Sequence, residues 1–389
     1  MEFTFTEEQQ MIRDTAAAFL AEVSTSGAVR AAMVTEVGYD PELWRRVCDE
    51  MYWPAMHIPE AYGGLGLGYV ELVAVLEQMG RYLLCSPFFS TVCLAANALL
   101  VAGSEAQKAC HLPQIAAGTT GTLAWTGAGG RWDADAVELT CRRESDGFVL
   151  DGTCRYVPDG HTAELLVVAA REPGSAREEG VSLFVLPGEA AGLERQRLPT
   201  MDQTRSQAQL LFDGVRLPLD SLMGDYGLAW PQLARIIDLA TVAVAADQVG
   251  VAQQSLDSTV AFLQERVQFG RVIASYQALK HKAADMMVKA EAARSAGYYA
   301  ACIADEALAG SALGAELPEA ASVAKACCSE AAFFNAGCGI QLHGGVGFTA
   351  EYDIQLLFKR AKSTETLLGT SAWHRERLAA MLLDGEAAA

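Results

Sequence analysis

The chain reads Gln341-Leu342-His343-Gly344-Gly345-Val346-Gly347-Phe348-Thr349 near its C-terminus, and Leu368-Gly369-Thr370-Ser371 follows about twenty residues later. The first stretch is a glycine-rich loop between two segments with helical patterns. Without side chains, the glycines allow the backbone amides to lie close against a phosphate-bearing ligand. This pattern predicts a helical region that binds a phosphate-containing cofactor.

The residue composition and hydrophobic pattern of the chain change twice along its length, which predicts three domains at residues 1–118, 119–226 and 227–389. The first is helical, with a helix capped by Thr6 and a further helix at Tyr69 to Tyr82. The middle part has short runs rich in β-branched residues between turns, typical of an antiparallel sandwich or barrel. The last is an alanine-rich helical bundle. The expected strands are 148–152, 165–170, 181–186 and 209–214, and the expected helices are 230–269, 278–309, 318–337 and 353–383.

Composition excludes several classes of function. The formal net charge is −19, which argues against nucleic acid or an anionic membrane as partner, because both require a basic face. No basic segment followed by an apolar run opens the chain, and no uninterrupted apolar stretch of about 20 residues is visible. Ten cysteines lie without metal-ligand spacing, so we expect reduced thiols, no metal site and a cytoplasmic protein.

The segment Glu265 to Arg271 closes one predicted helix just before another begins at Tyr276-Gln277. Two arginines, Arg266 and Arg271, flank this turn. Guanidinium groups next to a helix N-terminus can clamp a diphosphate. The alternative is a C-terminal turn whose arginines only favour the helix dipole.

The ordered set of motifs resembles the acyl-CoA dehydrogenase family over nearly the whole chain. The matching stretches are Phe5–Gln9, Ile58–Gly66, Phe212–Pro218, Glu265–Gln277, Gln341–Thr349, Arg360–Lys362 and Gly369-Thr370. The resemblance implies a helical domain, an antiparallel β domain and a four-helix bundle. It also implies FAD as cofactor, an acyl-CoA thioester as substrate, and α,β-desaturation with electrons passed to an electron-transfer acceptor.

The same resemblance implies that the FAD site is shared between two subunits. It assigns eight residues to the diphosphate and adenosine end of the neighbouring subunit's FAD: Arg266, Gln268, Phe269, Tyr276, Gln277, Gln341, Gly344 and Gly345. Thr126, Tyr156 and Thr370 are assigned to the flavin end of the chain's own cofactor. This second half departs from the family, because Ala124–Gly130 replaces a Thr-Glu-Pro-Gly loop and Tyr156-Val157-Pro158 replaces Trp-Ile-Thr.

The family's catalytic glutamate is absent. One family position is Leu368, immediately before Gly369-Thr370, and the other aligns with Ala240. Neither side chain can accept a proton. Glu365 and Asp238 are the nearest carboxylates that could substitute, although each is also compatible with a structural role.

Three hypotheses follow. The first is a subunit of a heterotetrameric acyl-CoA dehydrogenase that lacks its own base, resembling actinobacterial enzymes of sterol catabolism. The second is a homo-oligomeric dehydrogenase for acyl-CoA or an acyl-carrier protein, with Glu365 or Asp238 as an atypical base. The third is a flavin-poor scaffold or binding subunit. Two smaller expectations are that His343 either binds the cofactor or is satisfied within its loop, and that Trp373–Arg377 lies on a solvated helix.

Overall fold

The computed structural model describes residues 5–384, which form two compact units. In the described part of the chain, the first unit consists of the stretch ending at Ala31, the stretch Tyr69–Leu84, and everything from Thr241 onward. The second consists of Ala32–Gly68 and Cys85–Ala240. The order of helical, β and helical regions confirms the expected fold class. The three domain boundaries stay a prediction. The expectation about an N-terminal leader falls mainly on residues outside the described ones.

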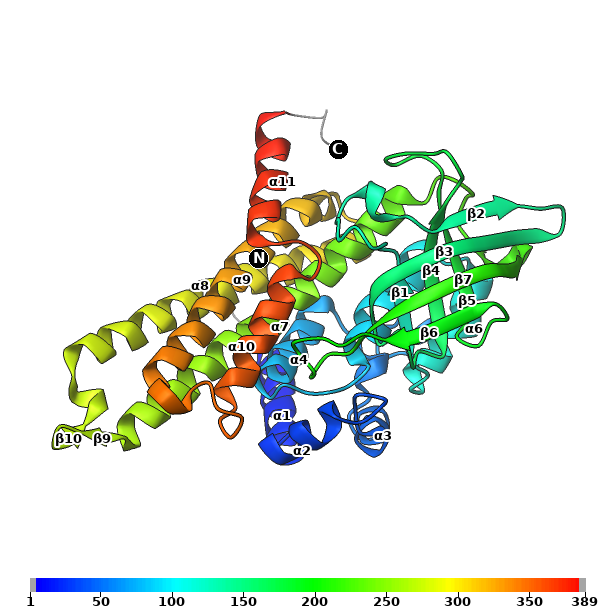
Figure 1. The fold of residues 1–389 in the computed structure, drawn as a ribbon. Coiled ribbons are helices and arrows are strands. Elements are labelled where there is room, and N and C mark those ends of the chain that lie inside the picture. The colour runs from blue at the N-terminus through cyan, green and yellow to red at the C-terminus, as the bar shows by residue number, and fades with distance from the viewer. Residues whose placement is uncertain (1–4, 385–389) are drawn as a thin grey trace. The chain divides into compact units, whose positions relative to one another are not determined.

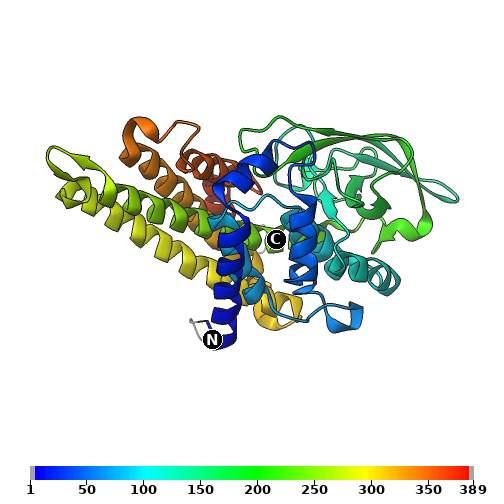
Figure 2. The ribbon, with the colours of Figure 1, turned by 90° about the horizontal axis from the view of Figure 1, so that it is seen from below.

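The first unit is a helical assembly in which the long helices α7, α8 and α9 run side by side (Figures 1 and 2). Its helices are α1 (Glu7–Val23), α4 (Tyr69–Arg81), α7 (Trp230–Glu265), α8 (Gln277–Leu308), α9 (Leu317–His343), α10 (Ile354–Thr366) and α11 (Ser371–Leu383). Helix α2 (Ser26–Met33) and the first part of α7 cross the division between the units. Helix α1 begins with the expected capping box, because the Thr6 hydroxyl accepts from the backbone N–H of Gln9 and the Gln9 side chain accepts from Thr6 N.

Helices α4 and α7 cross backbone to backbone, and glycine makes the crossing possible. A Cβ at Gly80 would stand 2.1 Å from the carbonyl oxygen of Asp247, and one at Gly250 would stand 1.9 Å from that of Glu77. Next to the crossing, the buried Arg360 of α10 donates to the buried carboxylate of Asp247 at 2.9 Å. Helix α4, from the N-terminal part of the sequence, is therefore an integral part of the C-terminal helical unit.

Two predicted helices are shorter than expected. The helix expected to reach residue 269 ends at Glu265, and a small hairpin of β9 (Val267–Gln268) and β10 (Arg271–Val272) follows. The helix expected over 353–383 breaks between Thr366 and Ser371, where Leu368 and Gly369 have φ of 59° and 102°. Two consecutive residues in the left-handed region end a helix, whatever the propensity of the flanking residues.

The second unit is built around a mixed β-sheet with the strand order β6-β7-β3-β2-β4-β5-β8 (Figure 1). The strands are β1 (Gly121–Ala124), β2 (Thr140–Arg143), β3 (Gly147–Pro158), β4 (Leu165–Arg171), β5 (Val181–Pro187), β6 (Leu193–Arg197), β7 (Gln207–Pro218) and β8 (Leu222–Met223). The expectation of a purely antiparallel domain needs correction, because β1 pairs with β4 in parallel and Thr140 of β2 pairs with Arg171 of β4 in parallel. Strand β1 leads into β4 only after β2 and β3, and a long connection of this kind permits parallel pairing.

Helical segments complete the second unit: α3 (Pro41–Asp49), a π-helix (Phe89–Ala96) that continues into α5 (Asn97–Ala102), and α6 (Glu105–Ala116). The sheet's core is formed by side chains such as Phe148, Phe184 and Leu210. Within residues 5–384, helix α7 is the one helix long and apolar enough to cross a membrane, and 94% of its apolar window is buried in the protein. Such burial is what the core helix of a globular unit shows.

Candidate functional site

Arg266 lies just beyond the end of α7, and its guanidinium is exposed, with no hydrogen-bond or ion-pair partner among residues 5–384. The neighbouring hairpin exposes Phe269, which is 91% accessible and has φ of 53°. Arg271 instead stacks on Tyr276, with its Cζ 4.0 Å from the ring centroid. The structure thus leaves Arg266 available to bind an anion and gives Arg271 a role within the chain.

The glycine-rich loop after α9 is open at the two positions that sequence reasoning singled out. A Cβ at Gly344 or Gly345 would meet nothing within 4 Å, whereas one at Gly347 would lie 2.5 Å from the carbonyl oxygen of Ile340. Packing within the chain therefore requires Gly347. It leaves free space at Gly344 and Gly345, where an external group can approach the backbone.

His343 ends α9 and is held within the chain. Its ring stacks on Phe262 at 4.3 Å, and its Nδ1 lies 2.7 Å from the carbonyl oxygen of Gly339. Burial lowers the pKa of His343 below its ordinary value, so the ring is neutral and Nδ1 donates to that carbonyl. A cavity of ≈420 Å³ adjoins this ring and is also lined by Arg266, Glu265 and Tyr352.

Gln341 lines a larger groove of ≈670 Å³ on the same unit. Its walls include Phe333 and Phe334 of α9 and two lysines of α8. Lys282 and Lys289 stand 6.0 and 4.9 Å from the Phe334 ring, and neither has an ion-pair partner in the described chain. An apolar groove with free cations suits a ligand that combines a flat ring system with phosphates. The groove, the free Arg266 and the open glycines therefore fit the diphosphate and adenosine end of FAD.

Leu368 occupies the turn between α10 and α11 and is only 3% exposed. The backbone around it is fixed by two side chains that sequence reasoning did not identify. Lys325 donates to the backbone carbonyl oxygens of Gly369 at 2.7 Å and Glu365 at 3.1 Å. The Nε2 atom of His374 lies 2.9 Å from the backbone carbonyl oxygen of Leu368. His374 is 1% exposed, so the expectation that residues 373–377 lie on a solvated helix is wrong for this side chain.

Burial dominates the ionisation of both groups. It lowers the pKa of His374 to about 3, so the ring is neutral and Nε2 carries the proton it donates. It lowers the pKa of Lys325 to about 7. The available signal for Lys325 was a lysine among the alanines and cysteines of α9, but helical periodicity alone cannot separate a buried lysine from one at the surface.

Neither alternative base is a free carboxylate. Glu365 pairs with Lys362 at 2.7 Å, and its side chain contributes to the wall of the 670 Å³ groove. Asp238 is 2% exposed and has interaction partners within the chain. Ala240, at the second family position, is completely buried.

In the second unit, the loop after β1 is occupied by the chain itself. The Glu138 carboxylate accepts hydrogen bonds from the backbone N–H groups of Ala128 and Gly129, both at 3.1 Å. A Cβ at Gly127 would lie 2.1 Å from the same carboxylate. The Thr126 hydroxyl donates to the carbonyl oxygen of Arg155 at 2.7 Å. Groups that could receive a cofactor here therefore already have partners within the chain.

Tyr156 lies at an irregularity in the β3–β7 ladder and has φ of 60°. Its ring is 36% exposed, and Arg155 lies over it at 5.6 Å. Pro158, two residues later, lacks the N–H and hydroxyl of a threonine.

Thr370 caps α11 by accepting from Trp373 N at 3.2 Å. Gln268 turns to its neighbour Val267, and Gln277 opens α8 at the surface.

Comparison with known proteins gives matches along the entire chain. Models of the acyl-CoA dehydrogenase N-terminal, middle and C-terminal domains match residues 6–119, 122–215 and 230–383. The acyl-CoA dehydrogenase IpdE2 of Mycobacterium tuberculosis is 36% identical, covering 93% of each chain. IpdE2 of Mycolicibacterium smegmatis is 33% identical, covering 96% of this chain and 98% of the relative.

Two solved structures illustrate the same similarity. A variant of the Tcur3481-Tcur3483 steroid ACAD superposes with a TM-score of 0.85 at 30% identity and covers 98% of this chain and 99% of that one. The ChsE4-ChsE5 complex from Mycobacterium tuberculosis contains a chain with a TM-score of 0.87 at 27% identity and the same coverage.

Proposed function

Because this chain belongs to the acyl-CoA dehydrogenase family of FAD-dependent oxidoreductases, we propose that it is the base-free subunit of a heteromeric enzyme. In this proposal a homologous partner chain holds the flavin ring and supplies the catalytic glutamate. This chain contributes the diphosphate and adenosine half of the partner's FAD site. The assembly is a heterotetramer in the cytoplasm.

The observation that carries the proposal is the absence of a base. Desaturation requires a carboxylate that removes the α-proton of the thioester, while FAD, when bound, accepts the hydride from the β-carbon. Leu368 and Ala240 occupy the two family positions, and both are buried hydrocarbon side chains. Glu365 and Asp238 are both engaged elsewhere.

The contrast between the two cofactor halves supports the same conclusion. In the helical unit, Arg266, Lys282 and Lys289 have no ion-pair partner among residues 5–384, and the backbone at Gly345 is open. In the β unit, Glu138 fills the amide loop and the Thr126 hydroxyl is already bonded. A chain that contributes residues to another subunit's FAD site needs the diphosphate and adenosine half in its helical unit, but it does not need a flavin-ring half in its β unit.

We infer bulky, sterol-derived acyl-CoA thioesters as the substrate class, with a separate electron-transfer protein as acceptor. The support is the similarity to a steroid ACAD and to one chain of a two-subunit ChsE4-ChsE5 complex. Both comparisons cover nearly the whole chain, so they apply to the entire subunit.

The test compares flavin content with and without the partner. Purified alone, the chain is expected to be colourless; co-expressed with its homologous partner, it should co-purify as a yellow complex that oxidises acyl-CoA. Arg266→Gln should weaken FAD retention in that complex, although the ring lies in the partner. Arg271→Gln is the matched control, since Arg271 already stacks on Tyr276.

Other outcomes would contradict the proposal. A yellow, active homomer would reject it in favour of an atypical base, and loss of activity in Asp238→Asn or Glu365→Gln would then identify that base. A complex that remains colourless and inactive would favour a scaffold role.

A further inference from the structure

Lys325 is fully buried, carries an ammonium group below about pH 7, and has no role in the proposed chemistry. Its three protons meet three acceptors, which are the carbonyl oxygens of Gly369 and Glu365 and the hydroxyl of Ser329 at 3.2 Å. No carboxylate forms an ion pair with it in the described part of the chain. Burial of an ammonium without a counter-ion is unfavourable, and an apolar side chain would fill the same space at lower cost. The presence of a lysine at this buried position is therefore explained by the backbone groups to which it donates hydrogen bonds.

What it holds is the turn around residue 368. Leu368 has φ of 59°, a region that a leucine seldom adopts. Such a conformation persists only where the surroundings over-determine it. Here Lys325 fixes the carbonyls on both sides of the turn, and the neutral His374 donates to the carbonyl of Leu368 itself. Gly369 completes the arrangement, because a Cβ there would lie 2.7 Å from Trp373 and 2.9 Å from His374.

The same turn could have been a helix. Helices α10 and α11 are separated only by Leu367–Thr370; leucine and threonine allow helical backbone, and Gly369 disfavours it by about 1 kcal/mol without forbidding it. The Leu367 and Gly369 amides bond to the carbonyls of Ser363 and Thr366, at 3.2 and 3.3 Å, as in a helix C-terminus. The break therefore depends on the buried donors that hold the carbonyls beyond it.

We infer that Lys325 and His374 are positioning residues that fix the direction of the side chain at position 368, so that the turn is still built to present a base although the base is absent. This inference rests on the proposed function, in which position 368 is the vacant base position. It adds that the loss is confined to one side chain. The machinery that orients that side chain remains intact.

Amide hydrogen exchange of the full-length chain tests the role of Lys325. In Lys325→Met, exchange at Leu367 and Gly369 should accelerate about tenfold or more, because two charge-assisted bonds to the turn are lost. The thermal midpoint should not fall, because a buried charge is also removed. Lys362→Met is the matched control, since Lys362 bonds only the Glu365 side chain near the same turn. Unchanged exchange at the turn, or acceleration spread equally along α9, would overturn the inference.

The His374 contribution is tested by rescue. His374→Leu should accelerate exchange at the turn, whereas His374→Gln retains an N–H donor and should restore most of the protection. Equal exchange in both variants would show that the ring only fills space.

A crystal structure of Leu368→Glu tests whether the direction is independent of the side chain. Glutamate and leucine have nearly equal helix propensities, so the substitution itself does not favour the break. The inference requires a positive φ at residue 368 and a carboxylate along the former leucine direction; a continuous α10–α11 helix would contradict it. These readouts concern the turn alone, so they can succeed or fail independently of the flavin content that tests the proposed function.

Discussion

At the scale of single residues, Lys325 should impose a pH dependence on stability. Its pKa is lowered by burial from 10.5 to about 7 in the folded chain. Between these values the unfolded chain binds more protons, so the free energy of unfolding should rise with pH from 7 to 10.5, by up to about 5 kcal/mol. Denaturant unfolding at several pH values should show this rise as a difference between the unchanged chain and Lys325→Met. Lys280→Met, at an exposed site, should show no such difference.

Asp305 should act in the opposite direction at acid pH. Its carboxylate lies on α8 and accepts from the backbone N–H groups of Tyr69 and Val70 at the start of α4, and burial raises its pKa from 3.8 to about 6. The folded chain then binds more protons between pH 4 and 6. The free energy of unfolding should therefore fall as pH rises through this window, by at most about 3 kcal/mol.

Asp305→Asn cannot ionise, and its single side-chain oxygen can still accept from Tyr69 N, although the second oxygen, which accepts from Val70 N, is replaced by an NH₂ group. The difference in unfolding free energy between the unchanged chain and this variant, measured from pH 4 to 6.5, should follow that fall. A difference that stays constant with pH would mean that Asp305 titrates normally.

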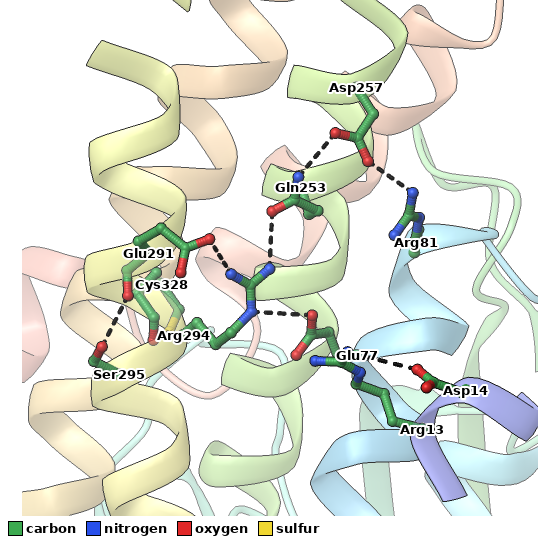
Figure 3. A network of polar contacts seen from close by, with 11 residues as sticks. Arg13, Asp14, Glu77, Arg81, Gln253, Asp257, Glu291, Arg294, Ser295 and Cys328 are labelled. Carbon is green, nitrogen blue, oxygen red and sulfur yellow. Dashed lines mark hydrogen bonds and ion pairs between the residues drawn. The ribbon is translucent and has the colours of Figure 1, made fainter. Parts of the chain in front are cut away.

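At the scale of elements, a polar network joins α4, α7 and α8 (Figure 3). Arg294 of α8 bonds Glu77 of α4 at 3.2 Å and Gln253 of α7 at 2.8 Å, and the Glu77 side chain is only 9% exposed. Arg294→Met would leave that carboxylate buried without its cation, and should cost about 2–4 kcal/mol in chemical denaturation. Arg294→Met combined with Glu77→Leu should recover most of the loss. Arg216→Met, which breaks the exposed pair with Glu144, should have no measurable effect.

The loop after β1 offers a second test at this scale. Gly127→Ala would displace the Glu138 carboxylate and release the Ala128 and Gly129 amides. Because Glu138→Ala also releases them, the two substitutions should not be additive. We expect a coupling free energy of about 1 kcal/mol in a double-mutant cycle. Additive losses would show that glycine at 127 is needed for the backbone and not for the carboxylate.

At the scale of the whole molecule, periodicity and turn residues were sufficient to predict most elements. The Thr6 cap, the start of α8 near residue 278 and the strands β4 and β5 all lie within a residue or two of their predicted places. These elements depend on local sequence patterns. Strand β6, Leu193–Arg197, is mostly polar and has no apolar run, so it was not predicted. Its hydrogen-bonded pairing with β7 stabilises the strand despite this composition.

The site was less accessible to prediction wherever tertiary contacts decide the outcome. Gly344 and Gly345 could be predicted because a cluster of glycines in a loop indicates backbone that a ligand can approach. The buried cation at residue 325, the neutral imidazole at 374 and the carboxylate at 138 could not, because each is defined by which distant groups it faces. The break at Leu368 has the same origin, since its cause lies on α9 and α11.

The close crossing of α4 and α7 has a consequence for biosynthesis. Helix α4 leaves the ribosome early, but the segment it packs against begins at Thr241. At typical elongation rates, the intervening 160 or so residues take on the order of ten seconds or longer to synthesise. During this interval a nearly all-buried helix lacks its partners α7 and α8 and has only α1 to pack against, while the intervening β unit can already fold. Nascent chains arrested before residue 241 should therefore recruit chaperones through α4, and the final helices should release them.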